Sequence, residues 1–359
     1  MDMTLNLLYK FPTFSIVLWY ISLAPFLQAQ DTEIRRAGAE FPSLFEYLLQ
    51  KPDSLPQLKI DTDWGRLIRT KEEEAYQPAV MSFYKQDGTL VELDVKVRAR
   101  GNARKKVCQF PPIKVKAAKQ QLKALGYGPE NKLKLVLPCQ AGKMHEDCLL
   151  REALAYQLYE LIDSIHVKTK IIALQCWQNG IEKHSFNAFL VEDKEAMTSR
   201  LNGRLLSQGK IRVTSLERWL YLKICFFQYM IANTDWSVAS RHNLQFLQLP
   251  GYQRVVAVPY DFDYAGLVNT SYAIPGSTIP IEDVSQRYFQ GKNVTEQEAR
   301  ECSQFFLSRK EQVLQYCQSM NLLRARSMDS VHQYLVDFFD LLEEEERMIK
   351  TFVNAPGGE

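Results

Sequence analysis

The sequence predicts an α+β protein with two lobes, in which a β-rich N-terminal lobe containing one main helix precedes a mainly helical C-terminal lobe. Three observations predict this class. Residues 76–193 contain strand-like runs, joined by strong turn signals, on either side of one amphipathic helix. Residues 194–350 contain three long helical stretches. The composition, 46% hydrophobic and 24% charged over 359 residues, is that of an ordinary globular protein.

The N-terminus predicts the compartment. Residues 11–29 form an apolar stretch of signal-peptide length that follows Lys10 and ends in a small residue, Ala29. We therefore expect residues 1–29 to be a signal peptide and the protein to be exported to the periplasm, the cell surface or the extracellular space. An uncleaved membrane anchor is the alternative, because a single basic residue precedes the stretch and Leu27 occupies the −3 position.

The first lobe is expected to follow a polar connecting segment, residues 30–75, that contains a packing helix at residues 42–50. Two alternating runs within residues 80–101 turn at Asp87–Gly88, the strongest local hairpin signal in the chain. Further strands are expected at residues 110–117 and 131–139.

One helix is expected at residues 146–162, because the leucines at positions 150, 154, 158 and 161 share a core-facing side. Two strands, residues 168–177 and 184–193, follow it and turn at Asn179–Gly180. Sheet, helix, sheet and then a helical half is the order of the two lobes of a protein kinase.

The second lobe is expected to begin with a buried helix at residues 215–232, opened by a capping box of Thr214 with Glu217. The other expected elements are a hairpin of residues 243–249 and 254–258, a helix at residues 295–320 opened by Thr295 with Glu298, a helix at residues 329–352 and a tail at residues 351–359. Residues 271–291 are rich in proline and glycine and are expected to form a loop that contacts an acceptor.

Four residues predict chemistry. Asp235 follows the helix at residues 215–232, and the hairpin brings Asn243 close to Asp261 and Asp263. Carboxylate and amide oxygens are the groups that phosphoryl transfer needs for its base and its metal ions. The alternative is that each residue only ends a helix or forms a turn, which is the commoner role of Asp and Asn in loops.

The motifs that carry this pattern resemble, in their order, those of the spore-coat-protein-H (CotH) family of atypical kinases. The similarity covers roughly residues 90–270. It consists of VRARGNARKK, PPIKVK, LLREALAYQL, QNG leading into FLVEDK, NTD followed by RHNLQFL, and PYDFDYAG.

The resemblance implies a two-lobed kinase-like fold and transfer of the γ-phosphate of ATP to a hydroxyl of a protein or other acceptor. It implies that Asp235 is the catalytic aspartate and that Asn243 and Asp261 bind Mg²⁺ or Mn²⁺. Asp263, two residues after Asp261, is expected to join them as a metal ligand only if a turn at this place brings both carboxylates to the metal ions. The resemblance also implies that a hinge, formed by Leu190, Val191 and Glu192, meets the adenine through its backbone.

The sequence offers several candidate cations for contacts with phosphate. Lys114 and Lys116 share one face of a strand, and Glu152 on the following helix is the expected ion-pair partner of one of them. Arg100 and Arg151 are further candidates for contacts with phosphate. The alternative is that the lysines are solvated residues on an outer face, as most lysines on strands are.

Two other classes of protein remain open. No glycine-rich phosphate loop is present, and Ala103 and Arg104 replace the small hydroxyl pair that the family often carries after RGN. A catalytically degenerate, secreted kinase fold that serves as a binding or scaffold protein is therefore the second hypothesis. A hydrolase that uses Ser240 beside His242 is the third, but the chain contains no GxSxG motif.

Charge and cysteine content narrow the classes further. A net charge of +2 gives no argument for binding to nucleic acid or to a membrane surface. The seven cysteines form no CxxC pair and no metal-ligand spacing, so buried free thiols are expected.

Overall fold

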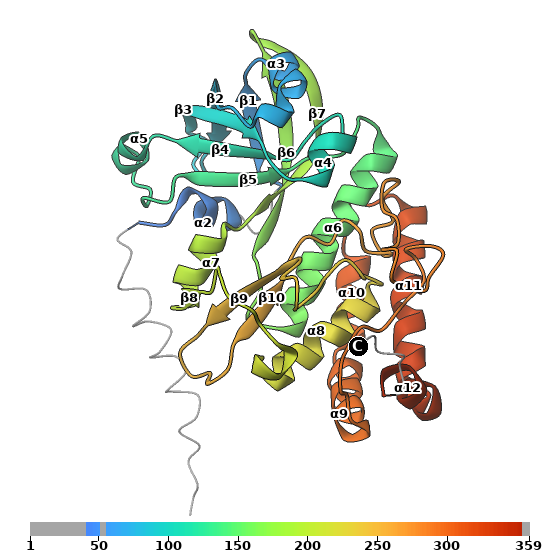
Figure 1. Ribbon diagram of the computed structural model, residues 1–359. Helices are drawn as coiled ribbons and strands as arrows, with labels where there is room; N and C mark the ends of the chain where they lie inside the picture. Colours follow the sequence, from blue (N-terminus) through green and yellow to red (C-terminus); the bar gives the residue numbers. More distant parts are fainter. Residues whose placement is uncertain (1–40, 51–54, 354–359) are drawn as a thin grey trace, which may run out of the picture. The chain divides into compact units, whose positions relative to one another are not determined.

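The computed structural model describes residues 41–50 and 55–353, and the elements below belong to one compact unit that begins at Pro42. This unit is a mixed α/β structure with a large sheet and several helices (Figure 1). The expected signal peptide, residues 1–29, lies outside the described residues. Within the described residues, no helix is both long and apolar enough to cross a membrane.

Seven strands form a closed barrel in the order β1-β2-β3-β4-β5-β7-β6. They are β1 (Gln57–Asp61), β2 (Gln77–Tyr84), β3 (Leu90–Ala99), β4 (Ile113–Ala117), β5 (Lys132–Val136), β6 (Thr169–Gln178) and β7 (Ile181–Val191). Neighbouring strands are antiparallel except β1 and β6, whose parallel pairing closes the barrel. The hairpins predicted at Asp87–Gly88 and Asn179–Gly180 are confirmed.

Strand β1 lies in the segment that was expected to be a connection. Its only buried residues are Leu58 and Ile60, so its sequence carries a short and weak alternating signal. Its parallel partner on β6 begins at Ala173, which is opposite Gln57. A strand that depends on a partner so distant in sequence cannot be read from local pattern.

The barrel interior holds one of two hydrophobic cores. Ile113 and Val115 point into it and are fully or almost fully buried, while Lys116 on the same strand is exposed. The prediction that the lysines of β4 face away from the core is therefore confirmed. Short helices surround the barrel: α2 (Leu44–Leu49), α3 (Trp64–Arg69), η2 (Lys71–Glu73), α4 (Ala103–Val107) and α5 (Lys119–Ala124).

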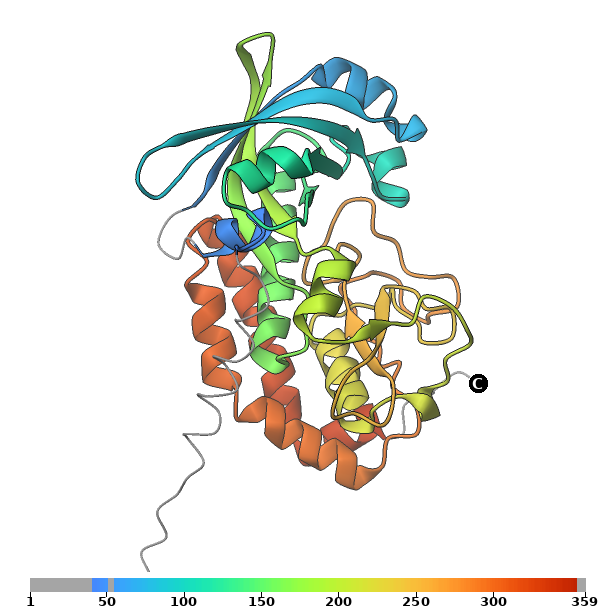
Figure 2. The same ribbon diagram turned by 90° about the vertical axis from the view of Figure 1, so that its left-hand side faces the viewer.

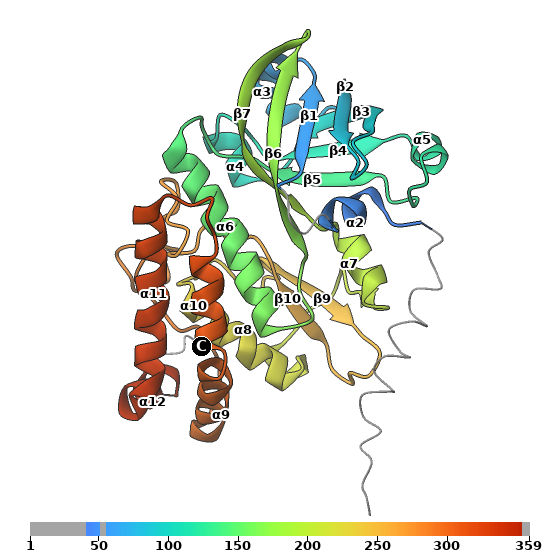
Figure 3. The same ribbon diagram turned by 180° about the vertical axis from the view of Figure 1, so that it is seen from behind.

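Helix α6 (Lys143–Ile162) confirms the predicted long helix. It packs against β6 and β7 of the barrel and against α8 and α10 of the helical part (Figure 3). Leu150, Leu154 and Leu158 are buried, as predicted, whereas Leu161 is only partly buried. Because α6 is covered on most sides, it holds its flanking loops in fixed positions.

The remaining elements are α7 (Lys194–Arg200), β8 (Arg204–Leu205), η3 (Val213–Ser215), α8 (Arg218–Met230), β9 (Leu244–Gln248), β10 (Val256–Pro259), α9 (Glu296–Leu307), α10 (Lys310–Gln318), α11 (Ala325–Glu343) and α12 (Glu345–Phe352). Strands β10, β9 and β8 form a small antiparallel sheet, which confirms the second predicted hairpin. The two long helices predicted near the C-terminus are each divided into two. The long connection between β10 and α9 is visible in orange in Figure 2.

One of the two predicted capping boxes is present. Thr295 and Glu298 cap α9 reciprocally. The box predicted for Thr214 and Glu217 is wrong, because α8 begins only at Arg218 and its N-cap makes no side-chain hydrogen bond. The Glu217 N–H instead donates to the Val255 carbonyl (2.8 Å), so this segment follows the sheet rather than the helix.

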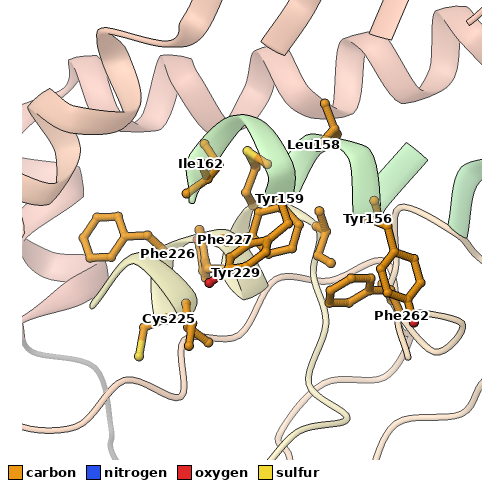
Figure 4. Close-up of a cluster of buried hydrophobic side chains, with 14 of the residues drawn as sticks. Tyr156, Leu158, Tyr159, Ile162, Cys225, Phe226, Phe227, Tyr229 and Phe262 are labelled. Carbon is orange, nitrogen blue, oxygen red and sulfur yellow. The ribbon is translucent and has the colours of Figure 1, made fainter. Parts of the chain in front are cut away.

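The second core joins α6 to α8 through aromatic rings (Figure 4). The ring centroids of Tyr159 and Phe227 lie 4.8 Å apart, and those of Tyr156 and Phe262 lie 4.7 Å apart, both edge to face. Such pairs add stability beyond the area that they bury. The cluster therefore fixes Phe262, and with it the segment that carries Asp261 and Asp263.

Candidate functional site

Asp261 is held by the aromatic core directly beneath it. Its backbone N–H donates to the Tyr156 hydroxyl (2.8 Å), and its neighbour Phe262 is fully buried. Its φ angle is +62°, in the left-handed region that Asp and Asn adopt more readily than other non-glycine residues. The carboxylate that follows β10 therefore has a fixed position, set from below by α6.

Asp235 and Asn243 form one hydrogen-bonded unit. The Asn243 side-chain nitrogen donates to the Asp235 backbone carbonyl (2.7 Å) and to Oδ2 of its carboxylate (3.0 Å). His242 Nε2 lies 2.9 Å from Asp235 Oδ1. Because the amide nitrogen of Asn243 is used in this way, its amide oxygen is the atom that can bind a cation.

The third group of charges is built around a buried arginine. Arg104 Nη1 donates to Glu152 Oε2 (2.9 Å), and its Nε lies 3.8 Å from Asp263 Oδ2. The Tyr272 hydroxyl donates to the same oxygen of Asp263 (2.9 Å). Arg104 Nε is buried and has no hydrogen-bond partner among the described residues.

The structure brings the predicted acids together around one cavity, the central cavity, of about 320 Å³. Its wall contains Asp235, Asn243, Asp261 and Asp263, together with His242, Tyr260, Tyr264, Val136, Pro112, Arg241 and the segment 100–104. Segments from β3, α4, β9 and β10 thus converge here. Asp235, Asn243, Asp261 and Asp263 thus lie in the wall of one cavity.

A smaller cavity, of about 70 Å³, adjoins the central one. The two share Arg100, Val136, Tyr260 and Asp261. The rest of the small cavity is lined by Lys134, Glu152, Tyr156, Val167, Val191, Glu192, Lys194, Met197 and Gln245. The small cavity, which has both apolar and charged residues in its wall, thus adjoins the central cavity.

The three predicted hinge residues lie differently. Val191 and Glu192 line the small cavity, while Leu190 points into the barrel core and is fully buried. The Glu192 carboxylate accepts from Arg200 Nε (2.7 Å) and Nη2 (2.8 Å) and from the Lys168 N–H (3.1 Å). The Glu192 backbone N–H in turn donates to the Lys168 carbonyl (2.9 Å), so both its side chain and its N–H are already used within the protein.

The predicted partners of Glu152 were wrong. Glu152 pairs with Arg104 and not with Lys114 or Lys116, and neither lysine lines the two cavities. Lys116 is exposed and Lys114 is half-buried, whereas Arg104 lies on the short helix α4 and is buried. The signal that could have found Arg104 was its departure from the hydroxyl expected after RGN.

Two further assignments change. Arg151 does not line either cavity, because its Nε donates to the Ser327 hydroxyl of α11 (2.9 Å). The expectation that Arg151 contacts phosphate is therefore corrected. Lys134, which the sequence analysis missed, lines the small cavity and forms an ion pair with Asp193 (3.0 Å). It lies opposite Lys114 in the β4–β5 register, so the two lysines share one face.

Burial and repulsion between neighbouring carboxylates raise the pKa values of three acids at the site. Burial, helped by the nearby Asp263, raises the pKa of Asp261 to about 7, against the opposing effect of Arg104. Burial also raises the pKa of Glu152 to about 8, against its pairing with Arg104. The pKa of Asp235 is raised by burial and lowered in part by His242. Three carboxylates, of Asp235, Asp261 and Asp263, and three arginines, Arg100, Arg104 and Arg241, thus line the central cavity.

The oxygen groups in this wall are of the kind that bind a divalent cation. In the described part of the chain, no three His, Cys, Asp or Glu side chains are grouped as a ready-made metal site. Mg²⁺ in phosphoryl-transfer sites is usually held by one or two carboxylates with phosphate oxygens and water. Asp261 and the Asn243 amide oxygen supply a donor set of this kind, and Asp263 lies in the same wall.

A disulfide between Cys108 and Cys139 ties the C-terminal end of α4 to the chain that follows β5. The expectation of free thiols is wrong for this pair. The other five cysteines are free, and all but Cys148 are buried. The disulfide anchors the short helix that carries Arg104, which gives the central cavity a fixed cationic wall.

Comparisons with known proteins do not assign a family. No protein-family model matches the chain, and no curated protein is significantly similar to it in sequence. Among solved structures, the chain is similar to the crystal structure of the proinflammatory kinase CtkA of Helicobacter pylori. That similarity has a TM-score of 0.39 and 9% sequence identity, and covers 70% of this chain and 95% of that one.

Proposed function

We propose that this protein is an exported atypical kinase, similar to the CotH family, that transfers the γ-phosphate of ATP to a hydroxyl acceptor with Mg²⁺ or Mn²⁺. The observation that supports it most is the convergence of Asp235, Asn243 and Asp261 on one cavity. In this proposal the barrel forms the N-terminal lobe, the helical part forms the C-terminal lobe, and the segment after β7 is the hinge.

In this proposal the donor nucleotide occupies the two adjoining cavities. The small cavity, with Val136, Val167, Val191 and Met197 in its wall, suits a planar base, and its polar edge suits hydrogen bonds from the hinge backbone. The phosphates then extend into the central cavity. Arg100, which belongs to both cavities, and Arg104, in the wall of the central cavity, are the cations that would meet them.

The acidic residues and Asn243 would have separate roles in the transfer, namely metal binding and proton acceptance. A divalent ion bound by Asn243 and Asp261 would neutralise the charge on the transferring phosphoryl group. Asp235 lies beside this position, with its carboxylate oriented by Asn243 and His242. The acceptor oxygen bonds to the γ-phosphorus, the bond from that phosphorus to the β–γ bridging oxygen breaks, and Asp235 takes the hydroxyl proton.

Export is part of the proposal. The apolar leader at residues 11–29 supports it, and the disulfide between Cys108 and Cys139 is typical of an oxidising compartment. An exported kinase needs a donor nucleotide supplied outside the cytoplasm. Fractionation of cells that express the full chain tests this point, and finding the unprocessed protein only in the cytosol would contradict it.

A degenerate binding or scaffold protein is the second candidate. One observation favours it: Glu152, the counterpart of the glutamate that orders a kinase lysine, is already occupied by Arg104, and Asp263 is shared between Arg104 and Tyr272. This candidate retains nucleotide binding or the fold alone but no phosphoryl transfer. Turnover therefore separates the two.

Nucleotide binding is the first test. The thermal unfolding of the protein would be followed with Mg²⁺ or Mn²⁺ and ATP together, with each metal alone, and with ATP and a chelator. At a hundred times its dissociation constant, the metal–nucleotide complex should add about 2.7 kcal/mol to the free energy of unfolding. Stabilisation by ATP that is equal with and without metal would reject the metal site, and no stabilisation would reject the donor site.

A further inference from the structure

A third cavity, the outer cavity, lies on the other side of Asp235. It has a volume of about 750 Å³ and shares only Asp235 and His242 with the central cavity. Its other wall residues are Ile211, Arg212, Val213, Thr214, Tyr221, Thr234, Trp236, Ser237, Val238, Ala239, Ser240, Gly276, Thr278, Ile279, Gln290 and Lys292. The Asp235 carboxylate therefore stands at the junction of the two spaces.

The wall of the outer cavity carries more positive than negative charge. Asp235 is the only carboxylate among the residues that line it, while Arg212 and Lys292 are exposed cations in its wall. The remaining wall consists of hydroxyl, amide and apolar groups. Away from the junction with the central cavity, a ligand in this space would meet positive charge and no negative charge.

Lys292 is carried by a fixed backbone. Its N–H donates to the hydroxyl of Tyr221 (3.0 Å), and its carbonyl accepts from Arg218 Nη1 (3.3 Å). Arg218 in turn forms an ion pair with Glu298, the capping residue of α9 (2.7 Å). The positive charge is thus set in the wall by contacts that do not use the lysine ammonium group itself.

We propose that the outer cavity is the acceptor site, and that the acceptor is a polypeptide segment in which acidic residues flank a serine or threonine. This inference rests on the proposed function, because it takes Asp235 as the group that receives the hydroxyl proton. The acceptor hydroxyl enters from the outer cavity, and the γ-phosphate reaches the same carboxylate from the central cavity.

The size and lining of the outer cavity favour a polypeptide over a small polyol or acid. Its volume is more than twice that of the central cavity, so a single sugar would leave most of it unfilled. The wall alternates apolar side chains, such as Ile211, Trp236 and Ile279, with hydroxyl groups, such as Thr214 and Thr278. Mixed lining of this kind suits successive side chains of an extended segment.

The positive charge of the outer cavity favours acidic polypeptides over basic ones. A segment with glutamate or aspartate beside the hydroxyl would place those carboxylates near Arg212 and Lys292, whereas a lysine-rich segment would meet like charge. This preference should weaken as salt increases, because both cations are exposed. Basic acceptors are thus the disfavoured class.

The test measures binding directly and does not need turnover. Fluorescent peptides of equal length carry a central alanine in place of the serine, flanked by glutamates in one peptide and by lysines in the other. Fluorescence anisotropy with the full chain should give at least about tenfold tighter binding of the acidic peptide at low salt. Equal binding of both peptides, or tighter binding of the basic one, would overturn the inference.

Charge-reversal variants assign the binding to this cavity. The double variant Arg212→Glu with Lys292→Glu should bind the acidic peptide at least about tenfold more weakly. The control, Lys183→Glu, reverses an exposed lysine on β7 that lies outside the cavity and should bind as the parent does. Unchanged binding in the double variant would overturn the assignment.

Nucleotide stabilisation of the same variants separates this inference from the function on which it rests. A double variant that keeps metal–nucleotide stabilisation is folded, so its loss of peptide binding belongs to the outer cavity. If the parent shows no nucleotide stabilisation but still prefers the acidic peptide through Arg212 and Lys292, the peptide site stands and the kinase proposal fails.

Discussion

Arg104 Nη1 and Glu152 Oε2, which lie 2.9 Å apart, join the short helix α4 to the long helix α6. Both side chains are buried, at 9% and 2% relative exposure, and Asp263 approaches the same guanidinium to 3.8 Å. An ion pair this deeply buried is held by geometry, because either charge would be costly without the other. It connects the cationic wall of the central cavity to the element that also positions Asp261.

Removal of Arg104 alone should destabilise the fold strongly. Above a pH of about 8, where Glu152 is ionised, Arg104→Met leaves its carboxylate buried beside Asp263 without its cation, and loss of one partner of a buried ion pair typically costs about 3–5 kcal/mol. Urea unfolding would measure the change. The double variant with Glu152→Gln should recover much of the loss, since it removes the stranded charge. A double variant as unstable as Arg104→Met would show that packing, not charge, is responsible.

Stability should fall as pH rises through the range in which the buried acids ionise. Asp261 has a pKa of about 7 in the folded state against an ordinary 3.8, and Glu152 has about 8 against 4.5. Between these values the folded state binds more protons than the unfolded state, so the free energy of unfolding decreases with increasing pH. Urea unfolding across this range would measure the slope, which Asp261→Asn should reduce. A free energy of unfolding that increases with pH across this range would contradict the raised pKa values.

The disulfide should contribute measurable stability. Cys108 and Cys139 are separated by 31 residues, and closing a loop of that length is worth about 3–4 kcal/mol in the chain-entropy description. Urea unfolding with and without reductant would measure this difference. The double variant Cys108→Ser with Cys139→Ser should have about the stability of the reduced parent, whether or not reductant is present. A parent protein that is indifferent to reductant would mean that the bond does not form.

Local signals predicted the hairpins well, because Asp87–Gly88 and Asn179–Gly180 encode their turns within a few residues. Strand β1 was missed because its partner on β6 lies far away in sequence. Thr214 and Glu217 had the spacing of a capping box, but a bond from Glu217 to Val255 kept that segment extended. Tertiary pairing thus overrode local propensity in both places.

The candidate site likewise contains residues that the local sequence predicts and residues that it does not. Asn243 and Asp261 could be predicted because a short hairpin brings them together, and Asp235 could be predicted because it lies only eight residues before Asn243, which hydrogen-bonds to it. The partner of Glu152 could not be predicted, because it depends on how α4 lies against α6. Lys134 was missed for a similar reason: among several lysines on neighbouring strands, only packing decides which one lines a cavity.

Asp261 is expected to hold the metal that holds the nucleotide. Asp261→Ala should abolish metal-dependent stabilisation by ATP while the apo protein stays folded, because the change also removes a buried acid with a raised pKa. Thermal unfolding with and without the metal–nucleotide complex measures both. Asp283→Ala, at an exposed position in the connection between β10 and α9, is the control and should respond as the parent does. Parent-like nucleotide stabilisation in Asp261→Ala would remove this residue from the site.

Asp235 is expected to act in the chemical step and to add little to nucleotide binding, because its carboxylate lies at the junction of the central and outer cavities. Asp235→Asn is nearly isosteric and can no longer accept the hydroxyl proton. It should keep metal-dependent nucleotide stabilisation but lose phosphoryl transfer to an acidic serine peptide by roughly 10²-fold or more, the usual size of a general-base contribution. Radiolabelled phosphate transfer measures the loss. Unchanged transfer would exclude Asp235 as the base, and a parent that binds the metal–nucleotide complex but transfers nothing to any acceptor would leave the scaffold protein as the better account.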